Sequence, residues 1–178
     1  MSMDGSGEMT GDSTRCVHSS LDPEVTTGSV HTPIFQTSTY VQNDFADHLG
    51  YEYARGDNPT RNALQRALAE MESPHQEAFG FCFGSGMAAI TTISQMLKQG
   101  DHVIACDDLY GGTVRLFDQI ASRFGIETSY SPLKSGDIGK VVRENSKILW
   151  LESPTNPLLT VHDIQSLAAE AKEHGLIV

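Results

Sequence analysis

From about residue 58 onward, short apolar runs alternate with segments whose apolar residues recur every three or four positions. The first periodic segment carries Leu64, Leu68 and Met71; Asn58 or Thr60 can cap it as a helix, and it ends near Ser73-Pro74. We expect further helices near 85–99, 112–125, 136–145 and 163–173, and strands near 77–83, 102–106, 126–130, 147–152 and 176–178. Continuous apolar strands alternating with amphipathic helices predict an α/β fold, a mostly parallel sheet flanked by helices.

The pattern also divides the chain. Residues 1–14 have no periodicity, and we expect a disordered tail. Residues 15–57 are irregular, with short β-prone pieces, and predict an extended N-terminal arm. Residues 58–178 form the α/β domain.

Composition excludes several function classes. The chain has 178 residues with a formal net charge of -11, which argues against nucleic acid or an anionic membrane surface as partner. No apolar run approaches the roughly 18 residues of a membrane span, and the acidic N-terminus does not resemble a signal peptide, so we expect a cytoplasmic protein. The three cysteines form no CxxC pair and the histidines no HxxxH pair, so no metal site is predicted.

The segment Tyr51–Arg61, YEYARGDNPTR, is the first candidate for chemistry. Tyr53 and Arg55 are two residues apart in an extended stretch and so share a face. A phenol and a planar guanidinium on one face suit a phosphate. A tyrosine-rich surface loop with solvated charges is the alternative.

A glycine turn, Gly84-Ser85-Gly86-Met87, opens the predicted helix at 85. Free N–H groups at a helix start, together with the Ser85 hydroxyl, can bind an anion. The same residues with Ala89 also satisfy GxGxxA, and the following strand ends in two aspartates, so the unit could instead bind NAD. A tight turn that needs glycine only for its conformation is a third possibility.

Two further strand ends carry unusual residues. After the strand near 102–106, Tyr110 precedes two glycines, which leaves an aromatic face clear for stacking on a flat ring. After the strand near 147–152, Asn156 lies between Pro154 and Pro157, and either X-Pro bond could be cis. Ligands bind at the carboxyl ends of strands in such sheets. Simple packing of the tyrosine and a plain turn are the alternatives.

The order of these motifs resembles the Cys/Met-metabolism family of enzymes that use pyridoxal 5'-phosphate (PLP). The motifs are YEYARGDNPTR, SGMAA, DDLYGGTVRLF and ESPTNPLL, and the resemblance runs from about Arg15 to Val178. The family includes cystathionine γ-synthase, cystathionine γ-lyase, methionine γ-lyase and O-acylhomoserine sulfhydrylases. It implies the aminotransferase-like fold of type I, PLP as cofactor and a small amino-acid substrate. It also implies a homo-oligomer, a tetramer built as a dimer of dimers.

The resemblance implies a role for each motif. Ser85 and the N–H groups of Gly86 and Met87 would hold the PLP phosphate. Tyr110 would stack on the pyridine ring and assist proton transfer, and Asn156 would hydrogen-bond the phenolic oxygen. The arm would bring Tyr53 and Arg55 to a neighbouring subunit's cofactor, while the substrate would meet Arg115 and Glu52.

The resemblance also narrows the reaction to Cγ of sulfur amino acids or homoserine esters. Gly112 stands where methionine γ-lyases typically carry cysteine, which favours a cystathionine γ-lyase or γ-synthase; Glu52 tilts the choice slightly to a lyase. The family's pattern continues past Val178, to an aspartate for the pyridine nitrogen and the Schiff-base lysine. None of the five lysines present matches that lysine (Lys98, Lys134, Lys140, Lys147, Lys172). We therefore expect an N-terminal fragment, inactive alone; a non-catalytic chain that docks to full-length subunits is the alternative, and an NAD-binding oxidoreductase a distant third.

Overall fold

The computed structural model describes residues 11–19 and 22–178. The chain divides into two compact units, residues 1–82 and 83–178, and each is described by itself. The sequence-based division at residues 57 and 58 stays a prediction. Most of the predicted tail, residues 1–10, lies outside the described residues, and its end enters helix α1 (Asp12–His18).

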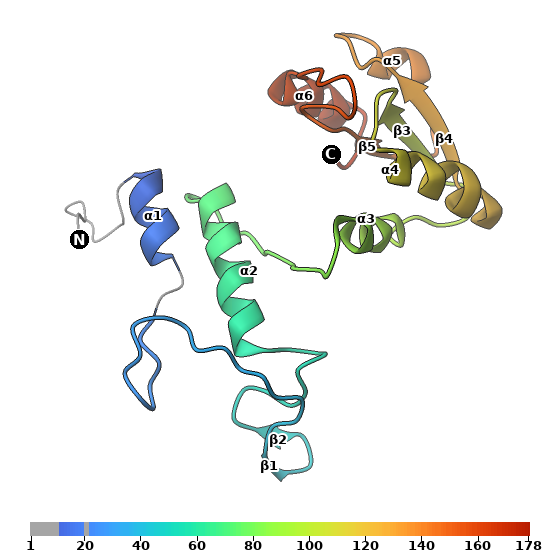
Figure 1. Ribbon diagram of the computed structural model, residues 1–178. Helices are drawn as coiled ribbons and strands as arrows, with labels where there is room; N and C mark the ends of the chain where they lie inside the picture. The colour runs from blue at the N-terminus through green and yellow to red at the C-terminus, as the bar shows by residue number, and fades with distance from the viewer. Residues whose placement is uncertain (1–10, 20–21) are drawn as a thin grey trace. The chain divides into compact units, whose positions relative to one another are not determined.

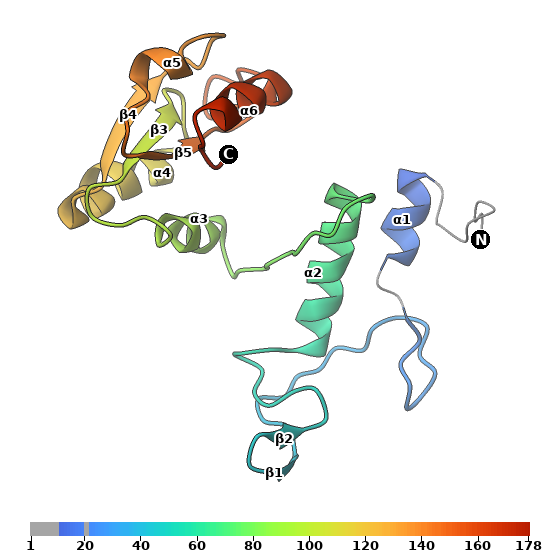
Figure 2. The same ribbon diagram turned by 180° about the vertical axis from the view of Figure 1, so that it is seen from behind.

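The first unit contains α1, a small antiparallel pair of strands, β1 (Gln42–Asp44) and β2 (Asp47–His48), and helix α2 (Pro59–Glu72). Helices α1 and α2 lie side by side (Figures 1 and 2). The predicted cap is confirmed: Asn58 Oδ1 accepts hydrogen bonds from the N–H groups of Thr60 at 2.9 Å and Arg61 at 3.2 Å. The helix ends at Ser73, as expected from Pro74.

The strand predicted near 77–83 is wrong, because the segment is extended but pairs with no strand of the described residues. Its backbone contacts a helix instead. The N–H of Cys82 donates to Gln65 Oε1 at 2.9 Å, and Gly80 lies so close to the Gln65 carbonyl that a Cβ atom would be 2.2 Å from its oxygen. The alternate residues Phe79 and Phe81 are 76% and 75% exposed.

The second unit is built on a parallel sheet in the order β4-β3-β5, formed by Glu127–Ser131, His102–Cys106 and Ser146–Trp150. Central strand β3 is buried at every position. Beyond β5 the predicted strand at 176–178 is reduced to one parallel bridge, between Ile148 and Ile177. The apolar core lies on both sides of β3, as predicted from its continuous apolar sequence.

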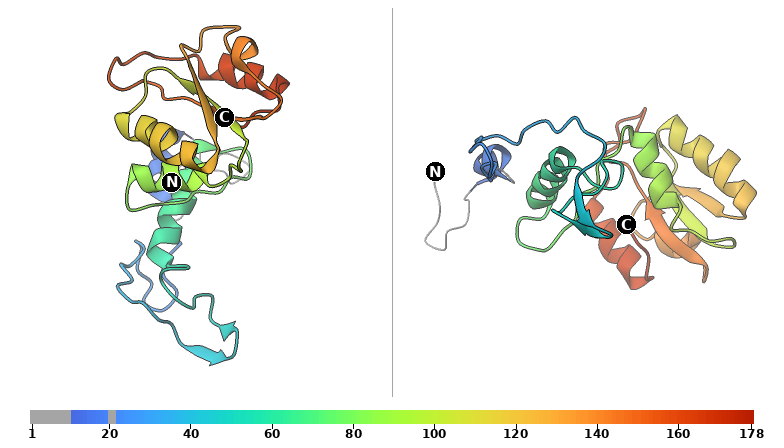
Figure 3. Two further views of the ribbon diagram at one scale, coloured as in Figure 1. Left: turned by 90° about the vertical axis from the view of Figure 1, so that its right-hand side faces the viewer. Right: turned by 90° about the horizontal axis from the view of Figure 1, so that it is seen from below.

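The helices of this unit are α3 (Gly86–Ser94), α4 (Gly111–Arg115), α5 (Ile138–Val141) and α6 (Ile164–Glu173). Helices α4 and α6 lie on opposite faces of the sheet (Figure 3). The helix predicted near 112–125 is α-helical only in α4; it continues as a π-helical turn (Leu116–Ile120) and a 3-10 turn (Ala121–Phe124), and Gly125 ends it with φ 74°. The predicted α/β class, with a parallel sheet flanked by helices, is confirmed.

Candidate functional site

The carboxyl ends of β3 and β5 are neighbours because the two strands pair in parallel. The loop that follows β3 leads to Tyr110, and the loop that follows β5 carries Glu152 as its second residue. The two loops meet: the N–H of Tyr110 donates to Glu152 Oε2 at 3.0 Å. Two motifs more than forty residues apart in the sequence are thus joined at one edge of the sheet, where ligands of parallel sheets bind.

Helix α3 reaches the same place. A Cβ atom on Gly112 would lie 2.4 Å from Cε1 of Tyr110 and 2.7 Å from Sδ of Met87. The absence of a side chain at Gly112 therefore leaves room for the Tyr110 ring beside Met87. Tyr110 remains 45% exposed, so one part of its ring is open to a ligand.

The start of α3 is arranged for an anion. Ser85 is the N-cap, and its Oγ accepts a hydrogen bond from the N–H of Ala88 at 3.1 Å, which leaves its own O–H to donate. Among the described residues, no acceptor is bonded to the N–H of Gly86 or of Met87. Unpaired N–H groups at a helix N-terminus attract negative charge.

Asn156 is exposed on the loop after β5, between two cis bonds, Ser153-Pro154 and Asn156-Pro157. The loop is closed by Thr155, whose N–H donates to the Thr160 carbonyl at 2.9 Å and whose Oγ1 accepts from the Thr160 N–H at 2.8 Å. In the part of the chain that the structure describes, the Asn156 amide has no hydrogen-bond partner, so it is free to bond a ligand.

In the first unit, the guanidinium of Arg55 lies over the ring of Tyr53, 4.8 Å from its centroid. Tyr53 is fixed by an antiparallel bridge to Thr39. The following turn is held by Arg61, whose Nη1 donates to the Ala54 carbonyl at 3.0 Å and Nη2 to the Gly56 carbonyl at 2.8 Å. The predicted pairing of Tyr53 and Arg55 on one face is thus present.

The residues predicted to meet the substrate are both exposed. The backbone carbonyl of Glu52 accepts from the N–H of Tyr40 at 3.0 Å, and its carboxylate makes no hydrogen bond or ion pair within the described residues. Arg115 is in the last turn of α4, with its guanidinium close to Gly111. Their role stays a prediction.

Comparison with known proteins decides the family. The family model described as Cys/Met metabolism PLP-dependent enzyme matches residues 13–178. The chain belongs to this family. The chain is 45% identical over 167 residues to a probable cystathionine γ-synthase of Herpetosiphon aurantiacus. This match covers 93% of the chain and 51% of that protein. It is 44% identical over 167 residues to a cystathionine β-lyase of Coxiella burnetii, with 92% and 42% covered.

Among solved structures, the cystathionine γ-lyase of Lactobacillus plantarum complexed with L-serine matches with a TM-score of 0.85 and 35% identity. That match covers 94% of this chain and 43% of the lyase chain. The chain thus spans about half the length, or less, of the relatives named here. The family confirms the resemblance and implies PLP as cofactor, and it replaces the NAD hypothesis.

The arrangement fits a PLP-dependent enzyme on the chain's own geometry. The unpaired N–H groups of Gly86 and Met87 suit the phosphate, and the Tyr110 ring, which lies against Gly112, is 45% exposed and so open to a planar ring. Of the two acids that follow β3, Asp108 is held by the fold, because its carboxylate accepts hydrogen bonds from the Thr155 hydroxyl and from the Leu158 N–H. Asp107 is exposed, so it is the family match that replaces the NAD alternative.

Sequence reasoning missed three residues of this family site that hold other residues in place: Asp108, Glu152 and Thr155. Thr155 is buried, and both acids face the loop opposite their own. The one available signal was position, because each acid follows a buried strand within two residues. Their partners lie on another loop, so no local pattern reveals the contacts.

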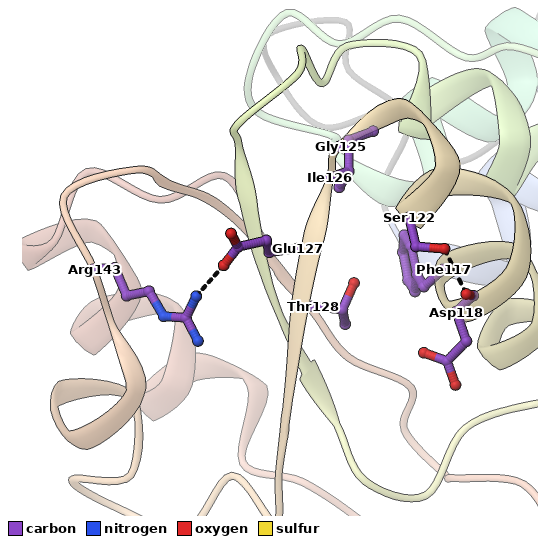
Figure 4. Close-up of a pocket in the computed structure, with 8 residues that line it drawn as sticks. All are labelled: Phe117, Asp118, Ser122, Gly125, Ile126, Glu127, Thr128 and Arg143. Carbon is purple, nitrogen blue, oxygen red and sulfur yellow. Dashed lines mark hydrogen bonds and ion pairs between the residues drawn. The ribbon is translucent and has the colours of Figure 1, made fainter.

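An open cavity of about 530 Å³ lies elsewhere, beside the start of edge strand β4 (Figure 4). Its lining includes Phe117 and Thr128 on one side and the ion pair of Arg143 with Glu127 on the other. It contains none of the predicted site residues and lies at the amino end of the strand, so it is not the candidate site.

In residues 11–19 and 22–178, no group of three or more His, Cys, Asp or Glu side chains is placed to hold a metal ion. Over the same residues, no helix has the length and apolar character to cross a membrane.

Proposed function

We propose that this chain provides the phosphate-binding and ring-stacking part of the PLP site of a transsulfuration enzyme that acts at Cγ of sulfur amino acids or homoserine esters. The observation that carries the proposal is the convergence of the start of α3, the Tyr110 ring and Gly112 in one unit. They belong to two different motifs of the sequence, SGMAA and DDLYGGTVRLF. Their approach is what a phosphate-bearing planar cofactor requires.

Each residue has one role in this proposal. Ser85 and the N–H groups of Gly86 and Met87 bind the phosphate, and the Asn156 amide donates to the phenolic oxygen of the ring. Tyr110 stacks on the ring and moves a proton at the substrate. Bound PLP supplies the electron sink for the chemistry.

Tyr53 and Arg55 bind the phosphate of a neighbouring subunit's cofactor in a homo-oligomer of cytoplasmic chains. The contact between the guanidinium and the Tyr53 ring supports this role, because it places the two groups side by side while Arg55 stays exposed. Arg115 and Glu52 are assigned to the amino-acid substrate. The exposure of both side chains is consistent with that assignment.

The finer choice is cystathionine γ-lyase or γ-synthase. Gly112 supports this choice, since a cysteine at this position, as methionine γ-lyases typically carry, would require Tyr110 and Met87 to move. Relatives of similar identity carry the names γ-synthase and β-lyase, so identity by itself does not choose between Cγ and Cβ chemistry.

The cofactor part is tested on the chain itself by equilibrium dialysis with PLP and with NAD. We expect saturable PLP binding that inorganic phosphate competes away, and weaker binding by Ser85→Ala. Binding of NAD in preference to PLP contradicts the proposal. Asp107→Ala is the matched control, because its exposed side chain makes no hydrogen bond or ion pair with the described residues.

The reaction is tested after co-expression with the C-terminal region of a cystathionine relative, because the chain matches only about half of those proteins. Cystathionine, O-acylhomoserine with cysteine, and methionine are compared as substrates. We expect turnover of one of the first two with cleavage on the γ side. Dominant methionine cleavage, or β cleavage of cystathionine, would contradict the assignment. Complex formation without turnover would favour the docking alternative.

A further inference from the structure

The loops after β3 and β5 hold each other through two carboxylates, and each carboxylate lies on the loop opposite its partners. Asp108 follows β3, and its Oδ2 accepts from the Thr155 hydroxyl and from the Leu158 N–H at 3.0 Å. Glu152 follows β5, and it accepts from the Tyr110 N–H at 3.0 Å and the Thr113 hydroxyl at 3.4 Å. The contacts are reciprocal, so neither loop can shift without loss of hydrogen bonds in the other.

Asp108 fixes the loop that carries Asn156. Its two donors, Thr155 and Leu158, flank Asn156 in the sequence, and Thr155 is buried at 1% exposure. The Thr155 hydroxyl donates to Asp108 while its oxygen accepts from Thr160. The position of the exposed Asn156 amide is therefore set by a carboxylate on the neighbouring strand end.

Glu152 fixes the start of α4 in the same way. Tyr110 is the N-cap of that helix and has no side-chain cap of its own. Glu152 holds this helix start from the other loop, since it accepts from the Tyr110 N–H and from the hydroxyl of Thr113 in the first turn. The backbone from which the Tyr110 ring projects is thus fixed by the loop that carries Asn156.

Neither carboxylate is part of an ion pair within the described residues. Each is compensated by two neutral donors, a hydroxyl and a backbone N–H. Hydrogen bonds to a charged acceptor are stronger than neutral ones. The geometry of these hydrogen bonds, and not an ion pair, therefore explains why acids occupy positions 108 and 152.

We propose that Asp108 and Glu152 are positioning residues that lock Tyr110 and Asn156 at a fixed separation for one planar ligand. The inference rests on the proposed function for the identity of that ligand, but the lock itself belongs to the apo protein. Neither acid needs to touch the cofactor. Tyr110 and Asn156 would each contact it from a loop whose position the other loop sets.

Hydrogen–deuterium exchange of the apo chain tests the lock. Asp108→Ala should speed exchange in residues 155–160, on the opposite loop, and Glu152→Ala should speed exchange at Tyr110 and the first turn of α4. Asp107→Ala, a neighbouring acid with no such contact, should change neither. Exchange that rises only on the substituted residue's own loop overturns the lock. Should an alanine variant fail to fold by circular dichroism, Asp108→Ser and Glu152→Thr are too short to reach the opposite loop and give the same comparison.

PLP dialysis of the same variants connects the lock to the ligand. Each alanine variant should bind PLP about tenfold more weakly, and the double variant should lose less than the product of the two, because both substitutions break one unit. Asp108→Asn and Glu152→Gln keep an acceptor oxygen and should restore most of the affinity and the protection. If the wild-type chain does not bind PLP, the proposed function fails while the exchange result still decides the lock. Normal PLP affinity in both alanine variants overturns the positioning role.

Discussion

A Cβ atom on Gly112 would lie 2.4 Å from Cε1 of Tyr110, closer than carbon atoms approach without overlap. Gly112 is buried, so the position is closed on the side away from the ring as well. The ring of Tyr110 occupies the space that any other residue at position 112 would fill. The glycine is therefore a requirement of the tyrosine's position.

Gly112→Ala should displace Tyr110 and Met87 and lower the free energy of unfolding by about 0–2.5 kcal/mol. Overpacking costs about 1–3 kcal/mol, and replacing a helical glycine with alanine returns about 0.5–1 kcal/mol. We expect a shift of the Tyr110 ring resonances by NMR and about tenfold weaker PLP binding. Gly111→Ala is the control, because the nearest atom to its new Cβ is the mobile end of Arg115, at 3.3 Å. Unchanged Tyr110 resonances in Gly112→Ala would contradict the steric argument.

Local signals predicted much of the fold. The Asn58 cap, the end of α2 at Ser73 and the buried strand at 102–106 each depend on residues close in sequence, and each is present. The segment 77–83 fails for the opposite reason. Its short apolar run predicts a strand, but a strand also needs a hydrogen-bonding neighbour, and here Gln65 of a helix takes that place. Register with a partner is not a local property.

The candidate site divides in the same way. Residues with unusual local chemistry, such as Tyr110 and Asn156, stand out because glycines and prolines surround them. Asp108 and Glu152 do not, since their partners are 39 to 50 residues away in the sequence. Contacts across neighbouring strands follow from the sheet order, which the sequence pattern does not specify.

Arg55→Ala should weaken PLP retention without loss of stability. Arg55 is exposed, and its guanidinium lies over the Tyr53 ring. Such a cation–π contact contributes about 0.5–1 kcal/mol to stability at an exposed site. A charge-assisted phosphate contact is worth more, about 1.5–3 kcal/mol, so retention in the assembled oligomer should fall about 10- to 100-fold.

Arg61→Ala gives the contrasting control for Arg55, since Arg61 donates to two backbone carbonyls of the turn. We expect the unfolding midpoint of Arg61→Ala to fall. Any change in its PLP retention should be indirect, through the turn that Arg61 holds. The two variants are compared by thermal unfolding and by the PLP that remains after gel filtration. A full cofactor load in Arg55→Ala together with a lower midpoint would contradict the assignment.

Phe79→Thr combined with Phe81→Thr should reduce binding of the dye ANS without lowering stability. Both rings are about three-quarters exposed, so they contribute little burial to the chain, and ANS binds exposed apolar surface. Threonine keeps the extended backbone favourable. Phe117→Leu is the control, because that ring is 1% exposed in the core and its loss should lower the unfolding midpoint. An equal loss of stability in the double variant and in Phe117→Leu would show that the segment at 77–83 is packed against the rest of the chain.

The last prediction concerns the buried histidine at the start of β3. His102 is 0% exposed; its Nδ1 lies 2.7 Å from Ser146 Oγ and its Nε2 2.9 Å from Ser129 Oγ. Burial, with a smaller contribution from Arg143, lowers the pKa of His102 below its ordinary value of 6.5, while Glu127 opposes the shift. The neutral imidazole is thus the form that the fold stabilises.

The direction in which stability changes with pH follows from proton linkage. Because the folded pKa of His102 is lower than the unfolded one, the unfolded chain binds more protons below about pH 6.5. The stabilisation is complete above that pH and falls as the pH drops toward the folded pKa, by at most about 1.4 kcal/mol per pH unit. His102→Asn should lower stability at pH 7.5 and flatten the decline between pH 6.5 and 5, measured by urea unfolding at each pH. His75→Asn, an exposed histidine, is the control and should leave the profile unchanged. A decline of the same slope in His102→Asn would show that other groups bind the protons.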